Sequence, residues 1–325
     1  MTQPTAPTKR RDDPLISLVV PCFNEEHAIP IFMEAVNRAL RDVRLEIIFV
    51  NDGSIDATLP VLIALSLEDD RVVVTNLSRN FGKEAALSAG VDLANGDVVV
   101  PIDCDLQDPP ALVVTFIERW RDGYDVVYGI RSNRSNDSKT KRVTARIFYR
   151  LFNRLSYTDI PSNVGDFRLM DRVVIDAVKQ MPERNRFMKG IFAWVGFTSI
   201  GVPYTRQIRP VGASKFSYWR LWNFALDGLV SFSTIPLRVW TYTGTLIAVS
   251  SVMYAIVIVI RTLVLGRDVP GYASIMTAVL FLGGVQLISL GVIGEYLSRL
   301  FTESKQRPIY IVNGIYRDGK QADAD

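Results

Sequence analysis

Histidine and cysteine are almost absent from this chain of 325 residues, which contains one histidine, His27, and two cysteines, Cys22 and Cys104. A structural zinc site takes four ligands, mostly from these two residue types. A disulfide framework needs several cysteine pairs. The composition therefore excludes a zinc site made of histidine and cysteine, and it implies no disulfide framework.

Two common nucleotide-binding motifs are also missing. The sequence has no GxGxxG, and Gly82-Lys83 lacks both the upstream glycine and the following serine or threonine of a P-loop. The formal net charge of +3 is too small to indicate nucleic-acid binding by itself. Ordinary dinucleotide enzymes and P-loop NTPases are therefore disfavoured, and we expect no nucleic-acid partner.

Long apolar runs occur near the C-terminus. Residues 241–265 and 273–293 are each close in length to the roughly 20 residues that cross a bilayer. Only a short turn separates them, so they predict a transmembrane hairpin within 239–298, with a cytosolic tail at 299–325. Arg261 and Arg267 near the turn weaken the charge asymmetry that sets orientation. The basic residues at the outer ends nevertheless favour a cytoplasmic position for both: Arg238, Arg299, Lys305 and Arg307.

Strand and helix patterns alternate before the hairpin. Residues 1–13 have no apolar stretch and predict a disordered tail, not a secretory signal. Five short β-branched segments are typical of strands: 16–21, 46–50, 72–77, 97–102 and 125–129. Helical spacing is found at 27–41, 57–69, 83–95 and 111–121. The alternation predicts an α/β domain over 14–212 with a mainly parallel sheet, which binds ligands beyond the carboxyl ends of its strands.

Polar residues gather at those predicted strand ends, where VPIDCDLQDPP places Asp103, Asp105 and Asp108 within six positions. Carboxylates this close repel one another, so a cation is expected among them. A turn or helix cap explains any single residue equally well, and Ser54 is placed to cap the helix after it. The joint occurrence favours a site. Its further members are Asn24, Glu25, Glu26, Asn51, Asp52 and Gly53.

Six segments together resemble a known family. VVPCFNEE at 19–26, FVNDGSIDAT at 49–58, NLSRNFGKEAALSAG at 76–90 and DCDLQDPP at 103–110 are similar to successive blocks of family 2 glycosyltransferases. With GDFRLMDR at 165–172, GASKFSYWRL at 212–221 and the hairpin, the chain resembles the polyprenyl-phosphate glycosyltransferases. That group includes bactoprenol glucosyltransferases and dolichol-phosphate mannose synthases.

The resemblance implies a GT-A fold, a nucleotide-sugar donor, Mg²⁺ or Mn²⁺, and a polyprenyl phosphate acceptor with inversion at the sugar. Asp103 and Asp105 match the DxD element, which holds the metal and the nucleotide sugar, so Asp105 is also counted as catalytic. Asp108 is a catalytic candidate that contacts sugar hydroxyls. The metal chemistry fits, because a divalent ion neutralises the nucleoside diphosphate as it leaves.

Further residues are assigned by their position in the family blocks. Asp52 is expected at the base or ribose, and Pro21, Asn24 and Glu26 around the same pocket. Lys83 either reaches the diphosphate or is a solvated residue in the first turn of a helix. Asp166 matches the catalytic base. It is equally open to positioning the acceptor, contacting the metal or capping a helix. The cations expected at the phosphates are Arg131, Arg168 and Lys215.

Two segments are expected at the membrane surface. Residues 131–154 are strongly basic, and Arg142, Arg146, Arg150 and Arg154 fall four apart on one helix face. Residues 213–238 mix aromatic residues with single charges, as interfacial helices do. We therefore expect membrane lipids as partners and a multi-pass protein of the inner membrane with its catalytic domain in the cytosol.

Several alternatives stay open. UDP-glucose is the expected donor, with GDP-mannose, UDP-galactose, UDP-N-acetylhexosamine and an aminoarabinose donor as rivals. A processive polysaccharide synthase is disfavoured because QxxRW is missing, and a non-catalytic scaffold or nucleotide sensor because the acidic residues are intact. A homo-oligomer is compatible with the hairpin. Cys22 and Cys104 end neighbouring predicted strands, so we expect them to lie close together and to be reduced.

Overall fold

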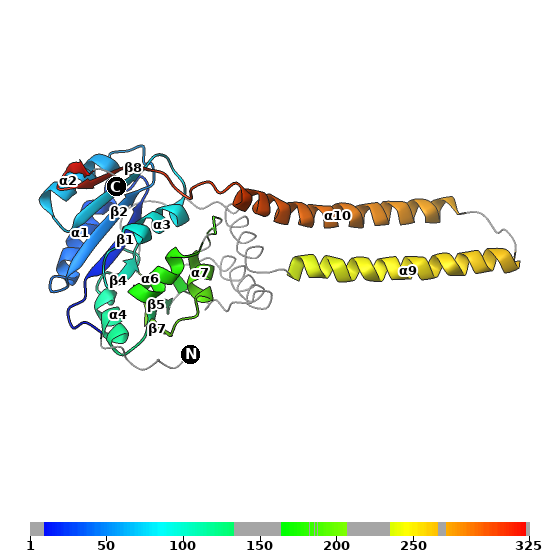
Figure 1. Ribbon diagram of the computed structural model, residues 1–325, viewed down its shortest axis with the longest axis horizontal. Helices are drawn as coiled ribbons and strands as arrows, with labels where there is room; N and C mark the ends of the chain where they lie inside the picture. Colours follow the sequence, from blue (N-terminus) through cyan, green and yellow to red (C-terminus); the bar gives the residue numbers. More distant parts are fainter. Residues whose placement is uncertain are drawn as a thin grey trace.

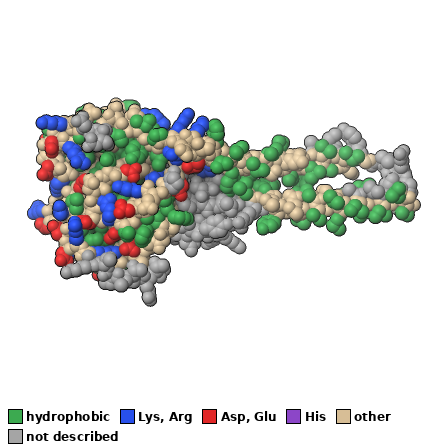
Figure 2. All heavy atoms as spheres, viewed as in Figure 1, with side chains coloured by type: hydrophobic (Ala, Val, Ile, Leu, Met, Phe, Trp, Pro, Cys, Tyr) green, Lys and Arg blue, Asp and Glu red, His purple; other side chains and the backbone are tan. Residues whose placement is uncertain are grey.

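The structure is a computed structural model that describes residues 10–132, 164–206 except 182, 185 and 187, 235–265 and 271–322. Figure 1 shows two long helices extending side by side from a head that contains the sheet. In Figure 2 the head carries many charged side chains, and hydrophobic side chains cover the two long helices. Two predicted membrane-surface segments lie largely outside the described residues. These are residues 213–234 of the segment 213–238, which include Lys215, and residues 133–154 of the basic run 131–154.

One mixed sheet forms the centre of the head. Within the described residues its order is β7-β5-β6-β4-β1-β2-β3-β8-β9. β1, β2, β3 and β4 run parallel, as do β5 and β7, whereas β6, β8 and β9 pair antiparallel with their neighbours. The prediction of a mainly parallel sheet is confirmed. The bounds are β1 Ile16–Cys22, β2 Leu45–Asn51, β3 Val72–Leu77, β4 Val98–Pro101, β5 Val126–Arg131, β6 Val164–Asp171, β7 Ser199–Tyr204, β8 Val312–Arg317 and β9 Lys320–Ala322.

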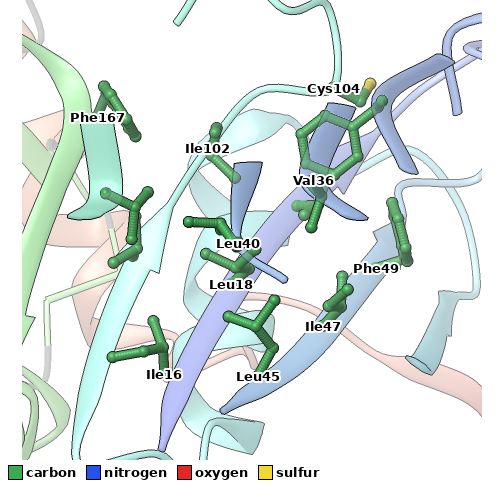
Figure 3. Close-up of a cluster of buried hydrophobic side chains, with 14 of the residues drawn as sticks. Ile16, Leu18, Val36, Leu40, Leu45, Ile47, Phe49, Ile102, Cys104 and Phe167 are labelled. Carbon is green, nitrogen blue, oxygen red and sulfur yellow. The ribbon is translucent and has the colours of Figure 1, made fainter. Parts of the chain in front are cut away.

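Helices cover both faces of this sheet (Figure 1). Side chains of a strand alternate between the faces, so Leu18 belongs to one apolar cluster and its neighbour Val19 to the other. Figure 3 shows the first cluster, with Leu18, Phe49 and Phe167 labelled. The four predicted helices are confirmed to within two residues at each end. The head helices are α1 Ala28–Ala39, α2 Thr58–Glu68, α3 Lys83–Leu93, α4 Leu112–Arg121, α6 Arg172–Lys179 and α7 Met188–Trp194.

The two long helices are α9 Ile235–Leu265 and α10 Tyr272–Ser304. The stretches Val239–Ile258 and Thr277–Ser304 are long and apolar enough to cross a membrane. Both predicted runs lie within these helices, which begin earlier and, for α10, end later than predicted. The helices continue because residues flanking the apolar runs are themselves good helix formers, such as Glu295 and Arg299, which pair one turn apart at 2.8 Å.

The segment after α10 is more than the tail that we predict for 299–325. β8 pairs antiparallel with β3 and extends the sheet. The Glu303 carboxylate accepts a hydrogen bond from the Arg184 backbone N–H at 2.9 Å, and Tyr310 donates its hydroxyl to Asp92 at 2.8 Å. The chain therefore returns from the apolar hairpin into the head and completes its sheet.

The N-terminal prediction also needs correction. Residues 1–9 lie outside the described residues, but Arg10 is fixed to the head. Its guanidinium contacts the Asp125 carboxylate at 2.8 Å and lies 5.0 Å from the centroid of the Trp120 ring. A cation held by a carboxylate and an aromatic face has a defined position. The ordered chain therefore begins before residue 14.

Gly90 sets the distance between α3 and the sheet. A Cβ placed there would lie 2.3 Å from Cγ1 of Val19 in β1. Gly90→Ala is therefore expected to destabilise the head by about 1–3 kcal/mol through overpacking, despite the better helix propensity of alanine. The thermal unfolding midpoint of the full chain in detergent measures this. Gly244→Ala is the matched control, because nothing lies within 4 Å of its added Cβ. An unchanged midpoint for Gly90→Ala would show that the helix moves away freely.

Candidate active site

A small pocket lies beyond the carboxyl ends of β1 and β4. Five of the site residues predicted from the sequence line it: Pro21, Lys83, Asp103, Asp108 and Asp166. Pro21 comes from β1, Lys83 begins α3, and Asp166 belongs to β6. The remaining lining is apolar and includes Leu87 and Phe167. The structure therefore brings together residues that are up to 145 positions apart, since Pro21 and Asp166 line the same pocket.

Lys83 connects two carboxylates in this pocket. Its ammonium lies 2.7 Å from Asp103 and 3.1 Å from Asp166. Burial lowers the pKa of Lys83, but the attraction of Asp103 and Asp166 outweighs it, so the pKa is raised and the group is charged. Lys83 does lie in the first turn of α3 with a side chain that is 39% exposed, but it is paired with two carboxylates as well as open to solvent. Its ammonium has three N–H donors, so a diphosphate could be contacted in addition.

Asp166 lies in a strand, which excludes the helix-cap alternative. It is the third residue of β6, and the cap of the following helix is Asp171, which accepts from the Val173 backbone N–H at 3.0 Å. Residues 166 and 168 of a strand lie on the same face of the sheet. Arg168 contacts Phe192, which belongs to the apolar cluster that includes residues of α3. The Asp166 carboxylate therefore lies on the α3 side of the sheet. This orientation explains its contact with Lys83.

The three clustered aspartates differ in their partners and in their burial. Asp103 contacts Lys83, Asp105 is buried and accepts from the Gln107 backbone N–H at 3.0 Å, and Asp108 is 3% exposed. Leu106 has a φ of 55°, which turns the loop between them. Within the residues that the structure describes, no three metal-ligating side chains lie close enough to hold an ion. Asp103 and Asp105 therefore remain the two predicted metal ligands, and Asp108 remains the candidate for the sugar hydroxyls.

Asp108 faces a residue that the sequence analysis missed. The Tyr204 hydroxyl donates to the Asp108 carboxylate, and Arg131 of β5 is the pairing partner of Tyr204 in β7. Burial raises the pKa of Asp108, although Tyr204 and Arg131 oppose it. Burial and the Asp108 charge raise the pKa of Tyr204 to about 12. The segment SIGVPY of β7 has a glycine and a proline, so its strand signal was weak.

Asn24 and Glu26 hold the loop after β2. The Asn24 backbone N–H donates to the Ser54 hydroxyl at 2.9 Å, and the Asn24 side chain accepts from the Ile55 N–H at 2.9 Å. Glu26 accepts from the Ala57 N–H at 2.8 Å. Ser54 therefore does not cap α2 as expected, because its hydroxyl is bonded to the neighbouring loop. The two predicted nucleotide contacts are positioned by these bonds at one rim of the sheet.

Asp52 supports the loop that precedes Lys83. Its carboxylate is 3% exposed and accepts from the backbone N–H groups of Phe81 at 2.7 Å and Gly82 at 3.0 Å. Burial raises the pKa of Asp52, and the two amide bonds counteract it. Gly53 allows the close approach, because a Cβ there would lie 2.4 Å from the Arg79 backbone. In this structure Asp52 acts on the loop at 79–82, and that loop starts the helix that carries Lys83.

Arg168 is buried at the back of the site. It is 5% exposed, donates to the Gly165 carbonyl at 2.9 Å, and lies 4.4 Å from the centroid of the Phe192 ring. Burial lowers the pKa of Arg168 to about 10. This placement suits a support for the strand of Asp166 better than a direct contact with the phosphate of an incoming acceptor.

Cys22 and Cys104 lie together beneath the site, as predicted. Cys22 ends β1, Cys104 lies three residues after the end of the neighbouring strand β4, and both are free and buried. Hydrogen bonding with Cys104 and burial raise the pKa of the Cys22 thiol, and both cysteines belong to the apolar core.

Two family models match this chain. The model described as "Glycosyl transferase family 2" matches residues 17–179, and the model "GtrB C-terminal hairpin" matches residues 235–300. Among solved structures, "Mannosyltransferase PcManGT from Pyrobaculum calidifontis in complex with GDP-Man and Mn2+" is 14% identical with a TM-score of 0.48, covering 90% of this chain and 87% of that one.

Curated relatives align over nearly the whole chain. "Bactoprenol glucosyl transferase" of Shigella phage SfV is 53% identical and covers 91% of this chain and 97% of its own. "Prophage bactoprenol glucosyl transferase homolog" of Escherichia coli (strain K12) is 50% identical, with 92% and 99% covered. "Uncharacterized glycosyltransferase sll0501" of Synechocystis is 52% identical, with 93% and 95% covered.

The two amide bonds of Asp52 generate a prediction for the loop at 79–82. Asp52→Asn replaces one accepting oxygen by a donor, which costs a charge-assisted hydrogen bond of about 1.5–3 kcal/mol. Amide hydrogen exchange at Phe81 and Gly82 is expected to accelerate by about tenfold or more. Asp70→Asn, at an exposed position outside the site, is the control. Equal protection in Asp52→Asn and the parent protein would show that Asp52 does not hold this loop.

Proposed function

The chain belongs to glycosyl transferase family 2, and we propose that it transfers glucose from UDP-glucose to polyprenyl phosphate at the cytosolic face of the inner membrane. One observation carries this proposal. The bactoprenol glucosyl transferases align with this chain at 50–53% identity over both the head and the hairpin. Glucose and the lipid acceptor come from the names of these relatives.

The reaction is a substitution at the anomeric carbon of the sugar. An oxygen of the lipid phosphate attacks this carbon, the bond to the nucleoside diphosphate breaks, and the configuration inverts. A phosphate monoester has its second pKa near about 6, so the acceptor is mostly a dianion and has little need of a base. Asp166 is paired with Lys83 at 3.1 Å. Its proposed role is therefore to orient the acceptor and Lys83.

The residues at the donor side fit a divalent metal ion, Mg²⁺ or Mn²⁺. Asp103 already faces a cation, the ammonium of Lys83 at 2.7 Å, and its side chain is 32% exposed. Asp103 and Asp105 would hold the ion, and the diphosphate of the donor would supply further oxygen ligands, as is usual for Mg²⁺. When bound, the ion neutralises charge on the leaving diphosphate. Lys83, released from Asp103, is then free to contact the same diphosphate.

The hairpin places the head where the acceptor is. α9 and α10 would span the bilayer, which keeps the pocket near the phosphate of a lipid whose chain stays in the membrane. Arg131 at the end of β5, together with Lys215, is proposed to bind this phosphate. Lys215 lies outside the described residues. Because the protein would be anchored in the membrane, its pocket would meet the lipid phosphate by diffusion within one leaflet and not through solution.

The test is an assay of lipid glucosylation. Full-length protein is incubated with Mn²⁺ or Mg²⁺, undecaprenyl phosphate and radiolabelled UDP-glucose, and label in the organic phase is counted. The rival donors GDP-mannose, UDP-galactose, UDP-N-acetylhexosamine and an aminoarabinose nucleotide run in parallel. We expect metal-dependent label from UDP-glucose that EDTA abolishes. Label from another donor would correct the sugar, and none from any donor would overturn the proposal.

Two substitutions test the acidic pair. Asp103→Asn and Asp105→Asn are each expected to lower kcat by about 100-fold or more, because each removes a charge that holds the metal and the donor. Both keep an oxygen that accepts hydrogen bonds, so the unfolding midpoint should hold. Asp122→Asn is the matched control, since Asp122 is exposed and pairs with Arg119 on the surface. Full activity in Asp105→Asn would contradict the assigned role.

A further inference from the structure

Tyr204 lies between two charged residues that serve different substrates in the proposed function, on which this inference rests. Its hydroxyl donates to Asp108, on the donor side, and Arg131, on the acceptor side, is the direct partner of Tyr204 in the pairing of β5 with β7. We infer that Tyr204 is a positioning residue that keeps Asp108 and Arg131 apart, so that Arg131 remains available to the phosphate of the lipid acceptor.

The separation matters because the two charges are opposite and shielded from water. Asp108 is 3% exposed, and Arg131 is partly buried. Attraction between such groups is strong at low dielectric, and arginine tends to bind a carboxylate with two parallel hydrogen bonds. In the part of the chain that the structure describes, the Asp108 carboxylate accepts a hydrogen bond from the Tyr204 hydroxyl, and the Arg131 charge attracts the same carboxylate. Without this hydroxyl, a direct ion pair would take up the donors that a phosphate needs.

The position of the hydroxyl is fixed by the packing of the ring. The Tyr204 ring meets Phe167 edge-on at 6.1 Å, and a Cβ on Gly129 would lie 2.7 Å from it. The Tyr204 carbonyl accepts from both the backbone N–H and the hydroxyl of Ser132, at 2.9 Å and 2.7 Å. Glycine at 129 therefore makes room for the ring, and β5 and β7 hold it in place. Phenylalanine at 204 would occupy the same space and lack only the hydroxyl.

The position of Arg131 shows what would be lost. Its guanidinium lies over Gly165, where an added Cβ would be 2.8 Å from Nη2. Gly165 directly precedes Asp166, so Arg131 lies at the side of the pocket where we place the acceptor. Closure onto Asp108 would move the guanidinium toward the donor side. The expected defect is therefore larger for the acceptor than for the donor.

Tyr204→Phe in the full-length protein tests this inference. In the lipid glucosylation assay, the KM for undecaprenyl phosphate is expected to rise about tenfold or more, as loss of a charge-assisted contact predicts. The KM for UDP-glucose should change less, because the charge of Asp108 is kept. The matched control is Tyr310→Phe, which removes another tyrosine hydroxyl that donates to an aspartate, Asp92, outside the site. An unchanged acceptor KM in Tyr204→Phe overturns the inference.

A second substitution separates positioning from simple destabilisation. Asp108→Asn removes the charge that attracts Arg131, so adding Tyr204→Phe in this background should shift the acceptor KM by less than about twofold. The lower kcat expected for Asp108→Asn does not affect this comparison. If Tyr204 only supports the fold, the acceptor KM shift persists in the double variant, and the inference fails.

A measurement of lipid binding in the absence of the sugar donor distinguishes failure of the positioning role from failure of the proposed function. Native mass spectrometry measures the retention of undecaprenyl phosphate by the parent protein, Tyr204→Phe and Tyr310→Phe. Weaker retention in Tyr204→Phe alone supports the positioning role even where no sugar is transferred, in which case only the proposed function fails. Equal retention in all three proteins overturns the positioning role.

Discussion

One ammonium group between two carboxylates organises the catalytic end of this molecule. Lys83 joins the start of α3 to the residues after β4 and to β6, which come together only in the folded chain. Two carboxylates that contact the same ammonium would repel one another without that cation between them. The geometry of the pocket therefore depends on a positive charge in this position. The proposed metal ion brings a second positive charge to the same carboxylates, so donor binding and the freeing of Lys83 become a single exchange.

Local patterns were sufficient for the first half of the head. The apolar strands and helices up to β5 have strong periodicity, so the elements and the strand-end rim followed from the sequence. β6 and β7 were missed for different reasons. β6 alternates polar and apolar residues only over the four positions 166–169, which is too short a pattern to predict a strand alone, and β7 contains glycine and proline. The link from Tyr204 to Asp108 joins residues 96 positions apart and has no local signal.

Individual site residues were harder to interpret than the site itself. We expected three residues, Asp52, Asn24 and Glu26, to face a nucleotide. In the structure, the side-chain oxygen of each one accepts a hydrogen bond from a backbone N–H group of a neighbouring loop. A match to a family's sequence blocks indicates that such residues are needed at a position. They do not separate a group that touches a ligand from one that shapes the loop around it. Hydrogen-bond partners make that distinction, and these depend on the fold.

The antiparallel pairing of β8 with β3 also affects how the chain is made. β3 is complete by Leu77, whereas its partner ends at Arg317, after both apolar helices. During synthesis the edge of β3 therefore stays open until the hairpin has been produced. Open strand edges pair readily with other chains. Early insertion of the helices into a bilayer would hold nascent heads apart in this interval, so the membrane would protect the protein from aggregation before it takes part in any reaction.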